Sequence, residues 1–111
     1  MKYENTDDES VTGTHLVGNV TTDYDTLVKV FGEPTFPDIS FDEKVTKEWV
    51  IKFTDYGDED ENLIATIYDW KQYELGTPYD IYPWHIGGTT GQAVWLVQEA
   101  IDNYKNGEGN E

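Results

Sequence analysis

Two strand-like runs, residues 45–53 and 63–70, are joined by a short and intensely acidic connection. In the first run Trp49, Ile51 and Phe53 share one face by the two-residue period of a strand. The second run is rich in β-branched and aromatic residues, which favour strands and suit a position covered on both sides. The glycine and the acidic residues between the runs are typical of a solvated loop. We therefore predict a central β-hairpin against which the rest of the chain packs.

Two further segments have the apolar spacing of amphipathic helices. The first helix is expected to begin after an N-cap at Thr22 and to end at Gly32, which Pro34 follows closely. The second helix is expected over residues 92–104. Its core-facing stripe comprises Ala93, Leu96, Val97, Ala100 and Tyr104, and is widened by Val94 and Ile101.

Residues 15–20 and 80–88 are expected to form the first and last strands. Because proline cannot donate to a sheet ladder, Pro83 places the last strand at an edge or a bulge. The predicted order is β-α-β-β-β-α, an α+β fold with a small, mostly antiparallel sheet and two helices packed on one face. The expected divisions are a flexible acidic tail at 1–12, a single domain at 13–105 and a flexible tail at 106–111.

The charge balance is the unusual part of the composition. The chain has 23 acidic residues against 7 lysines and no arginine, a formal net charge of −16. Such a surface repels nucleic acid and anionic membranes and attracts basic surfaces, so we expect no direct nucleic-acid binding and no membrane binding. Without arginine the usual bidentate clamp on an anionic substrate is also missing, which argues against many enzyme classes.

Residues suited to catalysis or to metal binding are few. The chain has no cysteine, and His15 and His85 are its only histidines. His85 lies between apolar neighbours, where a structural histidine is the better interpretation. Asp69 could be a strand-end carboxylate, but no sequence neighbour marks it as a general base. We therefore expect no enzyme activity, no cofactor and no metal, and the lack of an N-terminal apolar stretch predicts a cytoplasmic protein.

The acidic connection at residues 55–61 has three interpretations. The segment can be interpreted as a plain solvated turn, as a calcium-binding loop or as a contact surface for a basic partner. The absence of the ligand series of an EF-hand argues against the calcium-binding loop. The sharper form of the last interpretation is DNA mimicry, which needs further carboxylates on the same side because the loop alone carries too few charges. The candidate partner-binding residues are Asp23, Asp25, Asp42, Glu43, Asp55, Tyr56, Asp58, Glu59, Asp60 and Glu61.

Aromatic residues are plentiful, with four tryptophans and eight tyrosines. Most are expected in the core, but those in or near loops could anchor an interface with a basic protein or, as a minor alternative, with a carbohydrate. These candidate anchors are Tyr56, Tyr73, Tyr79, Tyr82 and Trp84.

Four short motifs occur in the order FGEP at 31–34, EWVIKF at 48–53, ATIYDWK at 65–71 and WHIGG at 84–88. This order is similar to a pattern found in small proteins encoded by tailed bacteriophages. The resemblance spans residues 14–104 and consists of hydrophobic and turn residues, so it implies a shared fold more than shared chemistry. It implies a host-takeover or counter-defence protein and carries no catalytic residue across.

These observations together predict a non-catalytic, phage-encoded inhibitor. It would act as an acidic DNA mimic that occupies the basic nucleic-acid-binding surface of a host protein, for example a restriction, CRISPR or DNA-repair enzyme. The alternative is an acidic structural or interaction module that binds a protein through exposed aromatics, with its charge serving solubility or adaptation to high salt. The sequence does not indicate an oligomeric state.

Overall fold

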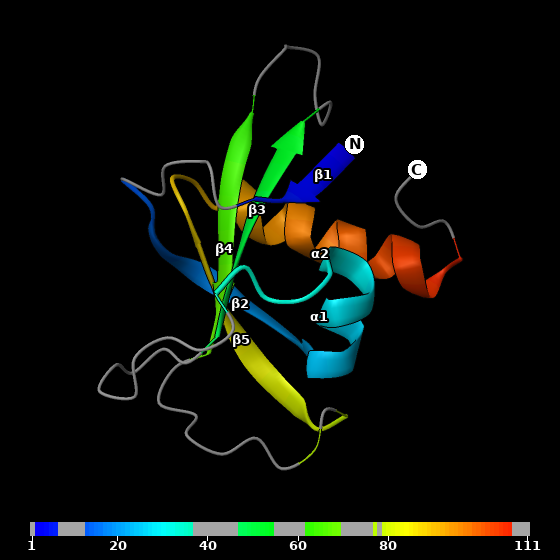
Figure 1. Cartoon of the computed structure of the whole chain (residues 1–111). Coiled ribbons are helices and arrows are strands. Elements are labelled where there is room, and N and C mark those ends of the chain that lie inside the picture. The colour runs from blue at the N-terminus through cyan, green and yellow to red at the C-terminus, as the bar shows by residue number, and fades with distance from the viewer. Residues whose placement is uncertain are drawn as a thin grey trace.

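The computed structural model of the chain describes residues 2–6, 13–36, 47–54, 62–69, 77 and 79–107. These residues form five strands and two helices (Figure 1). In chain order they are β1 (Lys2–Asn5), β2 (His15–Asp23), α1 (Tyr24–Phe31), β3 (Glu48–Thr54), β4 (Leu63–Tyr68), β5 (Ile81–Gly88) and α2 (Gln92–Lys105).

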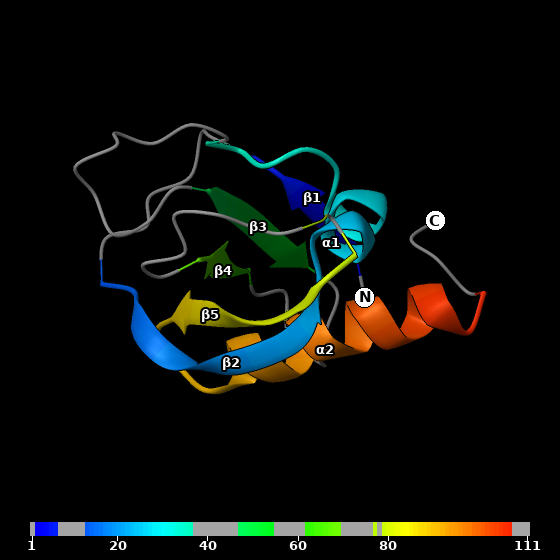
Figure 2. The same cartoon turned by 90° about the horizontal axis from the view of Figure 1, so that it is seen from below.

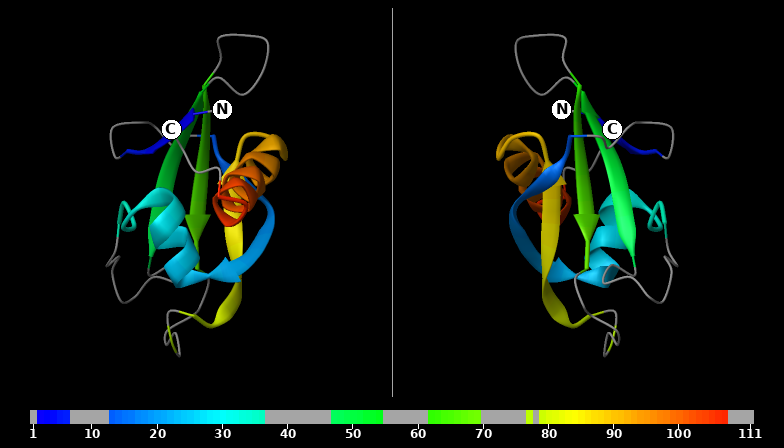
Figure 3. Two further views of the ribbon diagram at one scale, coloured as in Figure 1. Left: turned by 90° about the vertical axis from the view of Figure 1, so that its right-hand side faces the viewer. Right: turned by 90° about the vertical axis from the view of Figure 1, so that its left-hand side faces the viewer.

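The strands form one antiparallel sheet in the order β1-β3-β4-β5-β2. Figure 2 shows them in this order from top to bottom. Both helices lie on the same side of the sheet in Figures 1 and 3, and their buried side chains join one hydrophobic cluster with those of the sheet. The predicted α+β fold is confirmed, although its order is β-β-α-β-β-β-α, with one strand more than predicted.

The predicted central hairpin is present as strands β3 and β4. Its register pairs Trp49 with Ile67 and Ile51 with Ala65, and all four side chains are buried. Val50 and Thr66, which point to the opposite face, are buried as well, so the middle of the hairpin is covered on both sides. The acidic connection at 55–61 lies outside the described residues.

Two buried tryptophans hold helix α1 at both of its ends. The indole N–H of Trp84 donates to the carbonyl oxygen of Thr22, just before the helix, at 3.1 Å. The indole N–H of Trp49 donates to the carbonyl oxygen of Gly32, just after it, at 2.9 Å. The two indole rings meet edge to face at 5.4 Å, and the ring of Tyr24 lies 5.8 Å and 6.4 Å from them. The position of α1 is therefore set by side chains of β3 and β5.

The predicted N-cap of α1 is wrong by one residue. Thr22 is buried and still belongs to strand β2, because its side chain continues the inward alternation that Val20 begins. Asp23 takes the N-cap position instead. The predicted end at Gly32 is confirmed: its φ of 87° is a conformation that glycine adopts readily, and its N–H donates to the carbonyl of Val28.

The N-terminal residues 2–5 correct the expected flexible tail, because they form strand β1 paired with β3. Tyr3 supplies the apolar contact, with its ring 5.3 Å from the ring of Phe31 and 5.8 Å from that of Phe53. The side-chain amide of Asn5 donates to the carbonyl oxygens of Phe31 and Glu33. One tyrosine and one asparagine thus fasten a segment whose composition is otherwise polar.

Strand β5 lies inside the sheet, between β4 and β2, and not at the edge that Pro83 led us to expect. The ladder between β4 and β5 ends at the pair Tyr68–His85, and Pro83 lies beyond it, where β5 is paired only with β2, opposite Thr21. Proline is tolerated there because one side of the strand is locally an edge.

Helix α2 covers the sheet with the predicted stripe. Ala93 lies very close to β5: a Cβ atom added to Gly88 would be only 2.6 Å from the Cβ atom of Ala93. This close approach explains why a glycine stands at that strand position. Tyr104 departs from the prediction: it is 37 % exposed, because the last turns of α2 extend past the strands (Figure 1). The buried residues of the stripe are Ala93, Leu96, Val97, Ala100 and Ile101.

We expect Trp84→Phe to lower the free energy of unfolding by about 2–4 kcal/mol. Phenylalanine keeps a ring in the core, but it leaves a void and removes the donor to the buried Thr22 carbonyl. Trp95→Phe is the matched control, since Trp95 is 79 % exposed and should change stability by no more than about 0.5 kcal/mol. Urea unfolding followed by far-UV circular dichroism measures both, and equal effects of the two substitutions would contradict the role given to Trp84.

Candidate functional site

Most of the predicted partner-binding residues lie outside the described residues. Asp23 and Asp25 are described, and they lie together where α1 begins. Whether the ten predicted residues share one side of the molecule is therefore still a prediction. The eight that fall outside are Asp42, Glu43, Asp55, Tyr56, Asp58, Glu59, Asp60 and Glu61.

Asp23 and Asp25 both take part in local interactions of α1. The carboxylate of Asp23 accepts a hydrogen bond from the Thr26 hydroxyl. The carboxylate of Asp25 forms an ion pair with Lys29 one turn later at 2.9 Å. The hydrogen bond and the charge of Asp25 raise the pKa of Lys29, so this lysine offsets part of the negative charge at the site. These two acids stabilise the helix, and their local hydrogen bond and ion pair leave only part of their negative charge to attract a partner.

Negative charge is distributed unequally along the chain. The described residues contain nine of the 23 acidic residues and five of the seven lysines, a net charge of −4. The other fourteen acidic residues and two lysines lie outside the described residues, and together they carry a net charge of −12. The described sheet and helices are thus only mildly acidic.

The predicted aromatic anchors have different environments. Trp84 is completely buried, and Tyr82 packs edge to face on it at 5.0 Å, so both belong to the core or its margin. The expectation that Trp84 anchors an interface is therefore wrong. Tyr79 is 69 % exposed and could still serve as an anchor. Tyr56 and Tyr73 lie outside the described residues.

Trp95 is an exposed aromatic residue that the sequence analysis did not identify as a candidate anchor. It lies on the outer face of α2 and exposes 79 % of its surface. The signal was present in the sequence, because residue 95 falls off the apolar stripe of the helix, among polar neighbours at 98, 99 and 102. A tryptophan at such a position has no packing role in the core and is typical of an interaction surface.

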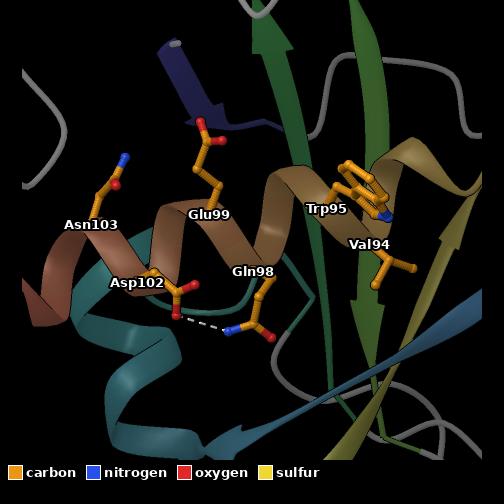
Figure 4. Close-up of a pocket in the computed structure, with 6 residues that line it drawn as sticks. All are labelled: Val94, Trp95, Gln98, Glu99, Asp102 and Asn103. Atoms are coloured by element: carbon orange, nitrogen blue, oxygen red, sulfur yellow. Dashed lines mark hydrogen bonds between the residues drawn. The ribbon is translucent and has the colours of Figure 1, made fainter.

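The outer face of α2 is hollowed around Trp95. Figure 4 shows Trp95, Glu99 and Asn103 along one side of the helix and Gln98 and Asp102 toward the other. The described residues that line this shallow, open hollow of about 520 Å³ are Val94, Trp95, Gln98, Glu99, Asp102 and Asn103, and we refer to them as the α2 surface.

The α2 surface is negatively charged and partly fixed in place. The side-chain amide of Gln98 donates to a carboxylate oxygen of Asp102 at 3.0 Å, which holds the Asp102 side chain along the helix (Figure 4). Glu99 is exposed and lies one turn after Trp95. Among the described residues that line the hollow there is no lysine. An exposed indole with carboxylates one and two helical turns further along the same outer face suits a cationic group.

A row of ionisable residues crosses the face of the sheet that the two helices do not cover. Glu48, Tyr68 and His85 are cross-strand neighbours on β3, β4 and β5, and the rings of Tyr68 and His85 stack at 5.5 Å. Burial raises the pKa of Glu48, and burial together with the charge of Glu48 raises the pKa of Tyr68. The stacking gives His85 a packing role.

The other groups considered for catalysis are dispersed or structural. His15 pairs with Gly88 on the β2–β5 ladder, whereas His85 pairs with Asn19, so the two histidines stand at different positions along it. Asp69 is buried, and its carboxylate accepts the backbone N–H of Lys47 at 3.0 Å next to the β3–β4 pair. In the part of the chain that the structure describes, no group of three or more His, Asp or Glu residues could hold a metal ion.

Comparison with known proteins adds no relative. No family model, no curated protein and no solved structure matches the chain. Among the described residues, neither helix has the length and apolar character needed to cross a membrane.

We expect Glu48→Gln to stabilise the protein more at pH 7 than at pH 4. Because the pKa of Glu48 is raised by burial, the folded state holds this proton more tightly than the unfolded chain does. Its contribution to stability is present at pH values below the ordinary glutamate pKa and is lost as the pH rises through the raised folded-state value. Glutamine stays neutral and avoids this loss.

The measurement is the urea midpoint of wild type and variant at both pH values. Glu99→Gln is the control, since it removes the same charge from an exposed position of α2 and so reports the general relief of repulsion in an acidic protein. A gain for Glu48→Gln no larger at pH 7 than that of the control would show that burial of Glu48 has no such effect.

Proposed function

We propose that this protein is a non-catalytic inhibitor that binds the basic nucleic-acid-binding surface of another protein as an acidic mimic of DNA. The observation that carries the proposal is the net charge of −16 without any arginine, together with the exposed α2 surface, where an aromatic residue lies among carboxylates. Proteins that bind nucleic acid present lysine and arginine to phosphates, and the same groups attract carboxylates.

The placement of charge supports association with a basic surface. The described residues have a net charge of only −4 and share one hydrophobic core, so the fold does not require cations to neutralise a large negative charge. The remaining net charge of −12 lies in other parts of the chain, with its densest run at Asp58–Glu61. Charges of one sign speed the encounter with an oppositely charged partner and fix its orientation.

The resemblance to small phage proteins extends the proposal to a biological class. A phage-encoded inhibitor of this kind would act in the host cytoplasm on a restriction, CRISPR or DNA-repair enzyme. Such an inhibitor works by occupying a surface, and so requires no catalytic residue.

A second candidate is an interaction module that binds a protein chiefly through exposed aromatic residues. The exposure of Trp95 favours this candidate, because an exposed tryptophan on a helix is the type of residue that dominates the energy of protein interfaces. In that case the acidic residues serve solubility, and partner binding depends little on ionic strength.

The test begins with capture of partners from a host lysate at low salt, with duplex DNA added as competitor. The captured protein is then titrated with wild type and with a variant that carries Asp58→Asn, Glu59→Gln, Asp60→Asn and Glu61→Gln. We expect the variant to bind at least about tenfold more weakly, because it loses four of the charges that face lysine and arginine, and its affinity should fall less steeply with salt.

A variant with Glu4→Gln, Asp7→Asn, Asp8→Asn and Glu9→Gln is the matched control, because it removes the same number of charges from the N-terminal segment. Binding that is indifferent to ionic strength, or that falls equally in both variants, would contradict DNA mimicry. Indifference to salt combined with a loss on Trp95→Ala would favour the second candidate.

A further inference from the structure

Trp95 is exposed on a helix face that the described residues leave uncovered. Four of the five hydrophobic side chains on the inner side of α2 are at most 1 % exposed, and Leu96 is 6 % exposed, whereas the indole of Trp95 is 79 % exposed. A partner that covers this aromatic surface would gain free energy, because its burial removes apolar area from water. The neighbours Gln98, Glu99 and Asp102 add polar groups on the same outer face, so the exposed region is a mixed aromatic and acidic surface (Figure 4).

The charge of the chain indicates what kind of partner covers this surface. A second copy of the chain would bring another net charge of −16 against it and would place Glu99 and Asp102 near like charges. The chain itself contains no arginine, and only two of its lysines, Lys44 and Lys71, lie outside the described residues. Neither source supplies a strongly basic segment, so charge complementarity assigns the surface to a different, basic protein.

We propose that the α2 surface is the docking site for an arginine-bearing segment of the basic partner, with a guanidinium group stacked on the indole of Trp95. This inference rests on the proposed function and names the group that the partner contributes. A guanidinium is planar and weakly hydrated, so it stacks on an aromatic face while its edge donates to carboxylates. In the proposed complex Glu99, one turn from Trp95, accepts from the edge of the stacked guanidinium, and Asp102, two turns from Trp95, accepts from a further cationic group of the same segment. Gln98 holds Asp102 in position.

The spacing along α2 fits a partner segment with more than one arginine. Trp95, Glu99 and Asp102 follow at intervals of four and three residues, which places them on one helix face within about 10 Å. A partner helix with arginines at the same intervals would meet the three groups in register. Lysine satisfies the charge but lacks the flat surface for stacking, so the site should prefer arginine.

The experiment titrates the full chain with two peptides of about 20 residues, one with arginines at helical spacing and one with lysines at the same positions. Binding is measured by fluorescence anisotropy of labelled peptide at low ionic strength, and the tryptophan emission of the chain is recorded alongside. We expect the arginine peptide to bind more tightly and to change the tryptophan emission of wild type more than that of Trp95→Ala, because Trp49 and Trp84 are buried and Trp70 is common to both proteins.

Two variants and a control test the role of each group. Trp95→Ala should weaken binding of the arginine peptide roughly 3- to 30-fold, and should reduce its preference over the lysine peptide. Glu99→Gln combined with Asp102→Asn should weaken binding of both peptides and flatten the salt dependence. Ile81→Ala, which removes an exposed apolar side chain from β5 and outside the α2 surface, should leave both affinities within about twofold.

The outcomes separate this inference from the proposed function. Equal affinity of Trp95→Ala and wild type for the arginine peptide, or equal affinity of wild type for both peptides, would overturn the docking site. If binding instead falls in the Asp58–Glu61 variant while Trp95→Ala is unchanged, the proposed function stands and the docking site fails. If neither peptide binds wild type at low ionic strength, the docking site fails, and partner capture with the Asp58–Glu61 variant decides the proposed function independently.

Discussion

The hydrogen bonds from two buried indoles to the ends of helix α1 hold the layers of this fold together. A helix of eight residues is too short to persist alone in water, and its stability must come from tertiary contacts. Trp84 bonds the carbonyl before the helix and Trp49 bonds the carbonyl after it, so β5 and β3 position α1 from both ends. The ring of Tyr24 lies near both indoles. Because the same indoles fill the centre of the core, the aromatic packing and the hydrogen bonding of the chain depend on the same two side chains.

Trp49 and Trp84 belong to the core, whereas Trp95 lies on the surface. The inner stripe of α2 completes the core, while its outer face presents Trp95 with Glu99 and Asp102. Core and surface therefore share one helix, and the packing of the stripe, down to the close approach of Ala93 to Gly88, fixes the direction in which the outer face of α2 points. A surface on a well-packed helix is preorganised, so this chain would lose little conformational entropy if a partner bound there.

Sequence periodicity predicted the elements whose apolar pattern is strong. The hairpin around Trp49 and the stripe of α2 follow directly from periods of two and about four residues. Strand β1 was not predictable in this way, because its place depends on contacts of Tyr3 with Phe31 and Phe53 that join distant parts of the chain. Trp84 was counted among the anchors in or near loops although it falls inside the predicted strand 80–88, and only the structure shows that its side chain points into the core. The exposure of Trp95 was predictable, because residue 95 falls off the apolar stripe of α2. The spatial grouping of the acidic residues was not predictable, because charged residues have no sequence period that places them on one face.

The pairing of strands also determines when the protein can fold during synthesis. Strand β2 pairs with β5, about sixty residues later, and β1 pairs with β3 across nearly fifty residues. The hydrogen bond from Trp84 to the Thr22 carbonyl closes an even longer loop than the β1–β3 pairing does. Helix α1 therefore lacks one of its two indole hydrogen bonds until β5 has left the ribosome. The β3–β4 hairpin can form earlier, but its helix-facing side chains stay exposed until α2, the last element, is translated. Such distant pairings slow folding and extend the time during which apolar strand surface is open to aggregation or to a chaperone.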